Sequence, residues 1–225
     1  MARFFTADYV ERALLRDGSA VRLRLVAPED KALLRREFER WSPESRYARF
    51  LAPKQQLTDE ELDYLCDLDQ ETHFAIGAVA EAGDGHGEPL GMGIARFIRL
   101  PTRDLEPVTA EAAIAVADTC HRKGLGRLLL MRLCAAAVER EIERFRCEVL
   151  VDNVSMRALI AAIAPVHTTE TRSGVLTMDF DIERVAPDTT LAEPQPENPL
   201  NRFFRAAAEN TIEWTDAVRR FWRRD

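Results

Sequence analysis

The sequence has little of what metal centres, disulfide frameworks and membrane spans require. Its 225 residues include four cysteines and four histidines, all scattered, and none form the close Cys or His pairs that bind zinc. We therefore expect neither a metal cofactor nor a disulfide framework. No stretch approaches the roughly 18 uninterrupted apolar residues of a membrane helix, so the sequence predicts no membrane span.

A basic excess and a leader-like N-terminus are also missing. The formal net charge is −7 at pH 7, which argues against a nucleic-acid partner and fits an amine-bearing substrate better. Charged residues stand where a signal peptide needs its apolar core, among them Asp8, Glu11 and Arg12. These features favour a cytoplasmic protein.

The residues that are present have the balance of a globular domain, with 46% hydrophobic and 31% charged residues. Apolar residues alternate at period two in some segments and recur at helical spacing in others. Their order, β-αα-βββ-α-β-α-ββ, predicts an α/β domain with a mixed sheet. The predicted strands cover residues 20–28, 72–82, 90–101, 106–118 and 144–151, with a hairpin over 168–182; the predicted helices follow the first strand and cover 126–141 and 153–163.

Local signals predict several element boundaries. Ser42 followed by Pro43 is typical of a helix start, and Thr58 with Glu61 three residues later forms a capping box. Asn153 can cap the last predicted helix. The hairpin is expected to turn at residues 173–174.

The composition divides the chain into four parts. Residues 1–17 are expected to be an N-terminal extension, 18–183 the α/β domain, 184–200 a proline-rich linker, and 201–225 an amphipathic helix. We expect this helix to dock on its own domain or on a second subunit in a homodimer rather than on a membrane.

The chemistry of the sequence concentrates in the stretch HRKGLG, residues 121–126, between a predicted strand and a predicted helix. The first N–H groups of a helix have no partner within it, and the helix dipole makes this end attractive to phosphate. Gly124 and Gly126 permit close backbone approach, and Arg122, Lys123 and Arg127 would add charge-assisted contacts. An ordinary strand-to-helix turn is the alternative, since neither a P-loop nor a Rossmann motif occurs.

This stretch resembles the signature (Q/R)-x-x-G-x-(G/A) of the GNAT superfamily of acyl-CoA-dependent N-acyltransferases. Both glycines are in register, and His121 stands where the family usually has Gln or Arg. The order of elements from about residue 18 to 183 also agrees. The segments 42–51 and 57–62 are similar to the helical insert of the protein-lysine acetyltransferase branch and its stand-alone relatives.

The resemblance implies a GNAT-like fold, acetyl-CoA as cosubstrate, and direct acetyl transfer to a primary amine in a ternary complex. It implies that the strand before the glycine turn parts from its neighbour, so that the pantetheine arm pairs with the open edge. The pyrophosphate would lie on the turn. The cofactor-binding residues implied are Ile114, Ala115, Val116, His121, Arg122, Lys123, Gly124, Leu125, Gly126, Arg127 and Asn153.

The resemblance also implies two catalytic residues. Glu111, just before the open edge, matches the place of the general base that deprotonates the amine; a solvated strand carboxylate is the alternative, and Glu106 is a weaker candidate base. Asn153 would orient the thioester or the pantetheine arm, or act only as a helix cap. Many relatives carry a Tyr in the helix after this Asn as general acid, and this sequence has none there.

Two function classes therefore stay open. The leading hypothesis is an N-acetyltransferase whose acceptor is a small amine or a protein lysine, and the alternative is a non-catalytic acyl-CoA-binding sensor or interaction module. The group Tyr47, Arg49 and Phe50 in the helical insert either lines the acceptor pocket or packs in the core. We expect His73 and His167 to be structural.

Overall fold

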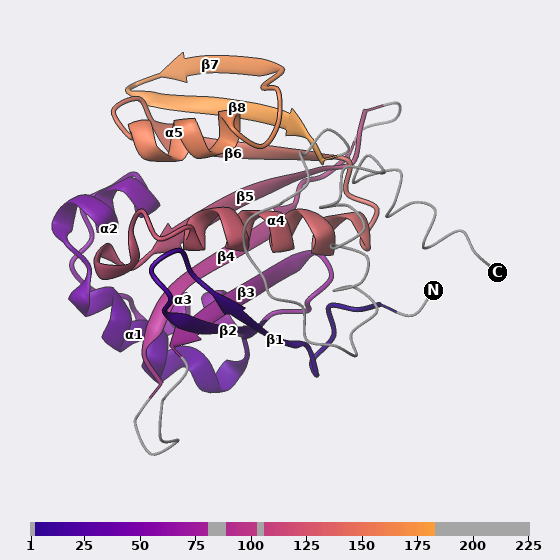
Figure 1. Ribbon diagram of the computed structural model, residues 1–225. Coiled ribbons are helices and arrows are strands. Elements are labelled where there is room, and N and C mark those ends of the chain that lie inside the picture. Colours follow the sequence, from indigo (N-terminus) through magenta and orange to yellow (C-terminus); the bar gives the residue numbers. More distant parts are fainter. Residues whose placement is uncertain (1–2, 81–88, 103–105, 183–225) are drawn as a thin grey trace.

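The structure is a computed structural model that describes residues 3–80, 89–102 and 106–182 (Figure 1). The predicted linker at 184–200 and the predicted helix at 201–225 lie outside the described residues and stay predictions. Within the described ranges, no helix has the length and apolar character needed to cross a membrane.

The elements follow the predicted order, with one additional strand at the start. The strands are β1 (Val10–Leu14), β2 (Ala20–Leu25), β3 (His73–Ala80), β4 (Gly91–Arg99), β5 (Thr109–Val116), β6 (Arg144–Leu150), β7 (Thr168–Arg172) and β8 (Val175–Asp181). The α-helices are α1 (Lys31–Arg40), α2 (Pro43–Phe50), α3 (Asp59–Cys66), α4 (Leu125–Val138) and α5 (Val154–Ala161).

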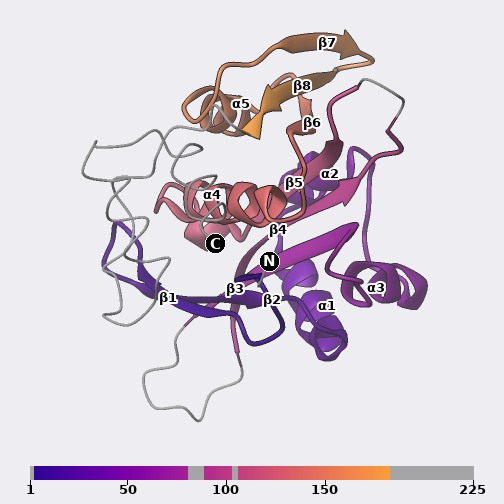
Figure 2. The same ribbon diagram turned by 90° about the vertical axis from the view of Figure 1, so that its right-hand side faces the viewer.

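The eight strands form one sheet in the order β1-β2-β3-β4-β5-β6-β8-β7. Figure 2 shows α1, α2 and α3 on one face of this sheet and α4 with α5 on the other. Two hydrophobic clusters match these two layers: a large one around α4 and a smaller one beneath α1 and α3. The predicted mixed α/β sheet is therefore confirmed.

The pairing of β5 with β6 is parallel and unusually short. It joins only residues 109–111 to residues 144–146, although both strands continue beyond these pairs. Every other pair in the sheet is antiparallel. From residue 112 onward β5 therefore has an open edge on the side of β6, and the sheet divides at this point.

The local signals of the sequence form as expected. The Ser42 hydroxyl accepts the N–H three residues ahead at 3.1 Å. In the capping box, Thr58 Oγ1 accepts the Glu61 N–H at 3.2 Å, and Glu61 Oε2 accepts the Thr58 N–H at 2.9 Å. Ser173 and Gly174 have φ of 51° and 81°, as a tight hairpin turn between twisted strands requires.

The N-terminal segment differs from the prediction, because β1 pairs antiparallel with β2 and so belongs to the sheet. The side chain of Glu11 in β1 is buried and forms two bonds with the Arg132 guanidinium of α4, at 2.7 and 2.8 Å. The Tyr9 hydroxyl donates to the same carboxylate at 2.6 Å. The buried charge of Glu11 interrupts the apolar alternation of β1, so the sequence pattern does not reveal this strand. The partner of Glu11 lies 121 residues away in the sequence.

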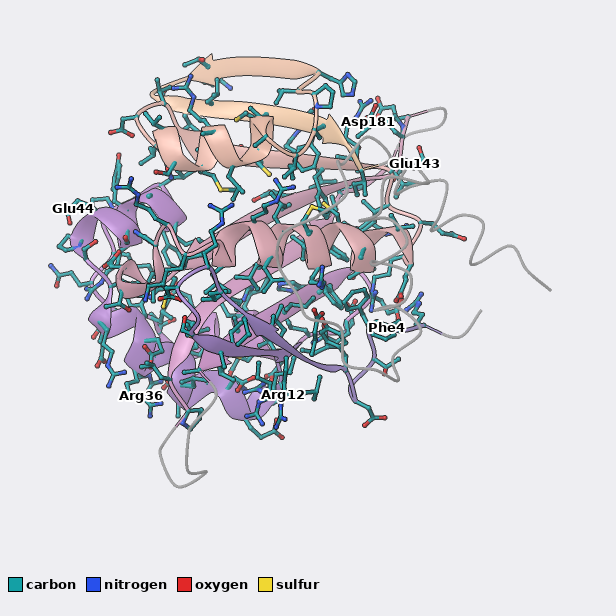
Figure 3. All side chains as sticks on the ribbon, in the orientation of Figure 1. Phe4, Arg12, Arg36, Glu44, Glu143 and Asp181 are labelled. Atoms are coloured by element: carbon teal, nitrogen blue, oxygen red, sulfur yellow. The ribbon has the colours of Figure 1, made fainter. Side chains whose placement is uncertain are left out.

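The residues before β1 are held at the C-terminal end of α4. The N–H groups of Phe4 and Phe5 donate to the Glu139 carboxylate at 3.2 Å, and Arg140 Nη2 donates to the Phe5 carbonyl at 3.1 Å. Figure 3 shows Phe4 on the side of the molecule where α4 ends. The segment predicted as an extension is thus part of the folded domain.

Candidate active site

The strand β5 presents alternate residues to the two layers of the molecule. Ala110 and Ala112 pack in the cluster around α4, whereas Ala115 packs in the cluster beneath α1 and α3. Because every second residue of a strand points to the same face of the sheet, Glu111 and Ala113 share the face of Ala115. The side chains of Ile114 and Val116 pack on the α4 side, so the predicted pantetheine edge is flanked by both layers.

The turn between β5 and α4 has the backbone conformation that the sequence predicts for a phosphate cradle. Gly124 has φ of 91° and caps α4, which begins at Leu125, one residue before the predicted start. Arg122 also has a positive φ, 63°. Because α4 begins at Leu125, the N–H groups of its first turn have no acceptor within the helix and lie at its positive end.

Gly126 lies in the first turn of α4, between α5 and β5. A Cβ at this position would lie 3.4 Å from Leu159 of α5 and 3.7 Å from Val116 of β5, which are ordinary contacts. Packing within the chain therefore does not require a glycine here. The Leu125 side chain is fully buried, so that residue offers only its backbone to a ligand.

The side chains of the turn have partners that the sequence does not predict. Lys123 Nζ forms an ion pair with Asp17 of the β1–β2 turn at 2.9 Å, and the Lys123 carbonyl accepts the Arg16 N–H at 3.1 Å. The imidazole of His121 lies 3.0 Å from the Val116 carbonyl. Arg122 is exposed and Arg127 is partly buried at the start of α4.

The Asn153 side chain acts as the cap of α5. Its Oδ1 accepts the Met156 N–H at 3.1 Å. The side chain is half-buried at the end of the loop that follows β6, across the opening from β5. The capping role of Asn153 is therefore confirmed.

The N-terminus of α2 is hydrogen-bonded to Asp118, which follows β5. Asp118 accepts the Ser42 N–H at 2.8 Å, and its other oxygen accepts the Ser45 hydroxyl. Burial raises the pKa of Asp118, but these two serines lower it more, so its pKa lies below the ordinary range. The carboxylate is therefore ionised at neutral pH and links α2 to the glycine turn.

Glu111 stands at the point where the sheet divides. It is the last residue of β5 that pairs with β6, and its side chain is exposed. Its cross-strand neighbours are Ile98 of β4 and Arg146 of β6. Arg146 is already committed to Asp179 through bonds of 2.9 and 2.8 Å, which leaves Glu111 without an ion pair to this neighbour. Glu106 is exposed and precedes β5, away from the division.

Two further residues on this side of the sheet, Arg96 and Tyr64, are not predicted from the sequence. Arg96 of β4 faces the same layer, is 4% exposed, and donates to the Leu65 carbonyl of α3 at 3.0 Å. The Tyr64 ring of α3 packs at 4.9 Å on the His73 ring. The position of Arg96 between apolar residues of β4 is the only signal in the sequence for this buried cation.

Arg49 of α2 completes the group that we call the α2–β5 cluster, formed by Arg49, Tyr64, Arg96 and Glu111. Burial lowers the pKa of Arg49, while Glu111 and Tyr64 partly offset this effect. Burial and the charge of Arg49 lower the pKa of Arg96. Burial and the charge of Arg96 lower the pKa of His73 to about 4, so His73 beside this cluster is neutral at pH 7.

An apolar pocket of about 60 Å³ lies between α1 and strands β2, β3 and β4. Trp41 and Ile94 belong to its lining. Ile98 is the cross-strand neighbour of Glu111, and Ile94 lies four residues before it on β4. Four residues span about 13 Å along a strand. This pocket is therefore separate from the division between β5 and β6.

Several features of the chain fit a coenzyme A thioester. The open edge of β5 can pair with an extended amide chain such as pantetheine, and the donors after residue 121 can bind its pyrophosphate. The positive φ of Gly124 brings the backbone, without a Cβ, to the surface of the cradle. The predicted contact of Lys123 with phosphate is the exception, since its ammonium is paired with Asp17.

Comparison with known proteins agrees with this geometry. The model of the Acetyltransferase (GNAT) family matches residues 33–162. The chain is 30% identical over 195 residues to acetyltransferase Pat of Mycolicibacterium smegmatis, a match that covers 87% of this chain and 54% of Pat. This chain therefore spans about half the length of that relative. It is also 30% identical to acetyltransferase PA5475 of Pseudomonas aeruginosa, over 64% of this chain and 73% of the relative.

A solved structure supports the same assignment. The GNAT domain of S. lividans PAT superposes with a TM-score of 0.68 and 27% identity, covering 79% of this chain and 99% of that domain. The similarity to the protein-lysine acetyltransferase branch is thereby confirmed. The chain belongs to the GNAT family of acetyltransferases.

Proposed function

We propose that this chain transfers an acetyl group from acetyl-CoA to a primary amine of a small molecule or a protein lysine, by direct attack in a ternary complex. The observation that carries the proposal is the exposed carboxylate of Glu111 at the point where β5 and β6 separate. Family membership supports the acetyl donor, and the similarity to acetyltransferase Pat supports acetyl transfer.

When bound, acetyl-CoA supplies the reactive thioester. The open edge of β5, residues 112–116, would hold the pantetheine arm, and the N–H groups of the glycine turn would hold the pyrophosphate. Asn153 would border the arm from the opposite side of the opening. These residues orient the donor along β5 toward Glu111, since the edge ends where that residue pairs with β6.

Glu111 has the properties of a general base. An alkylammonium must lose a proton before its nitrogen can attack, and a carboxylate within hydrogen-bond reach can accept this proton. Glu111 is exposed on the face covered by α1, α2 and α3, so an acceptor can reach it from that layer while the donor occupies the edge of the strand. No tyrosine occurs in α5, so protonation of the leaving thiolate falls to water or to a residue on another element.

The test is a thiol-release assay with acetyl-CoA and a panel of amines that includes a lysine peptide. We expect turnover by the wild type, and a fall of about 10²- to 10⁴-fold in kcat for Glu111→Gln. The acetyl-CoA affinity, measured by thermal stabilisation, should stay the same because the edge and the turn are unchanged.

Glu148→Gln is the matched control, since Glu148 is an exposed carboxylate on β6. It should keep wild-type activity. Unchanged kcat in Glu111→Gln would remove this residue as the base. Donor binding without turnover on any amine would favour the acyl-CoA-binding sensor instead.

A further inference from the structure

The α2–β5 cluster has more positive than negative charge, which is unexpected for a site that receives an amine. It contains two guanidinium groups, Arg49 and Arg96, and a single carboxylate, Glu111. His73 beside them adds no charge at neutral pH, because its pKa is about 4. A bare ammonium would be attracted by one group of the cluster and repelled by two.

The orientation of Arg49 follows from its helix. Ser45, one turn earlier on α2, bonds to Asp118 at the end of β5. Residues four apart share a helix face, so Arg49 also faces β5. Its guanidinium interacts electrostatically with Glu111 and Tyr64, which places it over the same layer of the sheet.

Arg49 has no direct anionic partner within the part of the chain that the structure describes. It makes no hydrogen bond and no ion pair there, and its Cζ lies 5.3 Å from the centre of the Phe50 ring. Arg96, by contrast, is satisfied by the Leu65 carbonyl and the His73 ring. Of the two cations, Arg49 is therefore the one whose donors are available to a ligand.

Three acids of α2 and α3 have other partners or lie away from Arg49. Glu61 is bonded to Lys54, and Asp59 is bonded to Arg35. Glu44, on α2 itself, is exposed and lies at the outer surface of the molecule (Figure 3). A partly buried guanidinium without a directly bonded acceptor is costly, and a carboxylate matches its planar fork through two parallel bonds.

We propose that the acceptor carries a carboxylate close to its reactive amine, and that Arg49 binds this carboxylate while Glu111 receives the proton of the amine. This inference rests on the proposed function. The carboxylate belongs either to an amino-acid-like small molecule or to an acidic residue beside a lysine of a peptide. The cluster then recognises both ends of one acceptor, an anion by Arg49 and a cation by Glu111.

The experiment compares two matched pairs of acceptors in the thiol-release assay with the full chain. One pair is free lysine and cadaverine, which is lysine without its carboxylate. The other is a lysine peptide with glutamate next to the lysine and the same peptide with glutamine. We expect the carboxylate member of one pair to be preferred by about tenfold or more in kcat/KM, and the pair that shows the preference identifies the source of the carboxylate.

The variant Arg49→Gln should raise the KM of the preferred acceptor about ten- to a hundredfold, because it loses charge-assisted hydrogen bonds. The KM of the acceptor without a carboxylate should change about twofold or less, and Arg49→Lys should retain part of the preference. Arg35→Gln is the control: it removes the same charge from an exposed position on α1 and should leave the preference intact.

Two results would overturn the inference while the proposed function stands. One is turnover without a preference for either carboxylate acceptor. The other is an equal effect of Arg49→Gln on both members of a pair, with acetyl-CoA still raising the Tm of the variant as in the wild type. Absence of thiol release with every acceptor would instead overturn the proposed function, and this inference with it.

Discussion

At the scale of the residue, Gly124 determines the shape of the donor site. Its φ of 91° turns the chain into α4, which begins at the next residue. A side chain at this φ costs about 1–2 kcal/mol, so a substitution here would strain or shift the start of α4. We expect Gly124→Ala to lower the stability slightly and the acetyl-CoA affinity by about tenfold or more, as measured by calorimetry.

A substitution at a second glycine, Gly174, serves as a control that separates the effect on stability from the effect on acetyl-CoA affinity. Gly174, in the β7–β8 turn, has a similar φ of 81°, and a Cβ there would meet no atom within 4 Å. Gly174→Ala should therefore lose a similar amount of stability and keep the acetyl-CoA affinity. If both variants bound acetyl-CoA like the wild type, the glycine turn would not be the pyrophosphate site.

At the scale of the element, the buried pair Glu11–Arg132 attaches β1 to α4. Removing one member leaves its partner's charge in the interior, which costs about 3–5 kcal/mol of unfolding free energy. We expect this loss for Glu11→Gln in urea unfolding at pH 7. Arg22→Gln, at an exposed position on the neighbouring β2, should stay within about 0.5 kcal/mol of the wild type.

The pH dependence of this pair provides an independent check. Burial raises the pKa of Glu11, but Arg132 and Tyr9 outweigh it, so the folded pKa lies below the ordinary value of about 4.3. The stabilisation is therefore complete above pH 4.3 or so, and is lost as the pH falls through the folded pKa. The difference in unfolding free energy between the wild type and Glu11→Gln should shrink as the pH falls below about 4. A difference that stays constant with pH would show that the Glu11 carboxylate is not stabilised by Arg132.

At the scale of the whole molecule, the N-terminal segment is part of the domain although the family match begins at residue 33. Phe5, Tyr9 and Leu15 are each at most 4% exposed, and burial of a large apolar side chain contributes about 1.5–3 kcal/mol. Losing the burial of all three side chains would therefore remove a free energy comparable with the whole stability of a typical domain, about 5–15 kcal/mol.

Deletion of residues 1–17 should therefore abolish cooperative thermal unfolding, followed by circular dichroism. The double variant Val10→Thr, Leu14→Thr is the control, because these side chains of β1 are 54% and 47% exposed. It should unfold close to the wild-type Tm. A deletion variant with an unchanged Tm would show that β1 is dispensable.

Several features of this chain were determined by the sequence itself, because their causes are local. The caps at Ser42 and Thr58 depend on hydrogen bonds between residues three apart, and the turn at Gly124 depends on a φ that glycine adopts freely. The order of strands and helices follows from apolar periodicity within single segments. The similarity of the glycine turn to the GNAT signature indicated the family from the same short stretch.

Other features depend on groups that only the tertiary structure brings together. The GNAT resemblance implied that β5 separates from its neighbour, but the register that ends the pairing at Glu111 is set by β6. The strand β1 depends on an ion pair across 121 residues. The pairing of Lys123 with Asp17 joins segments remote in sequence, as does the approach of Arg49 to Glu111. Burial and charge act through space, so periodicity along the chain identifies which residues face inward but not which residues meet.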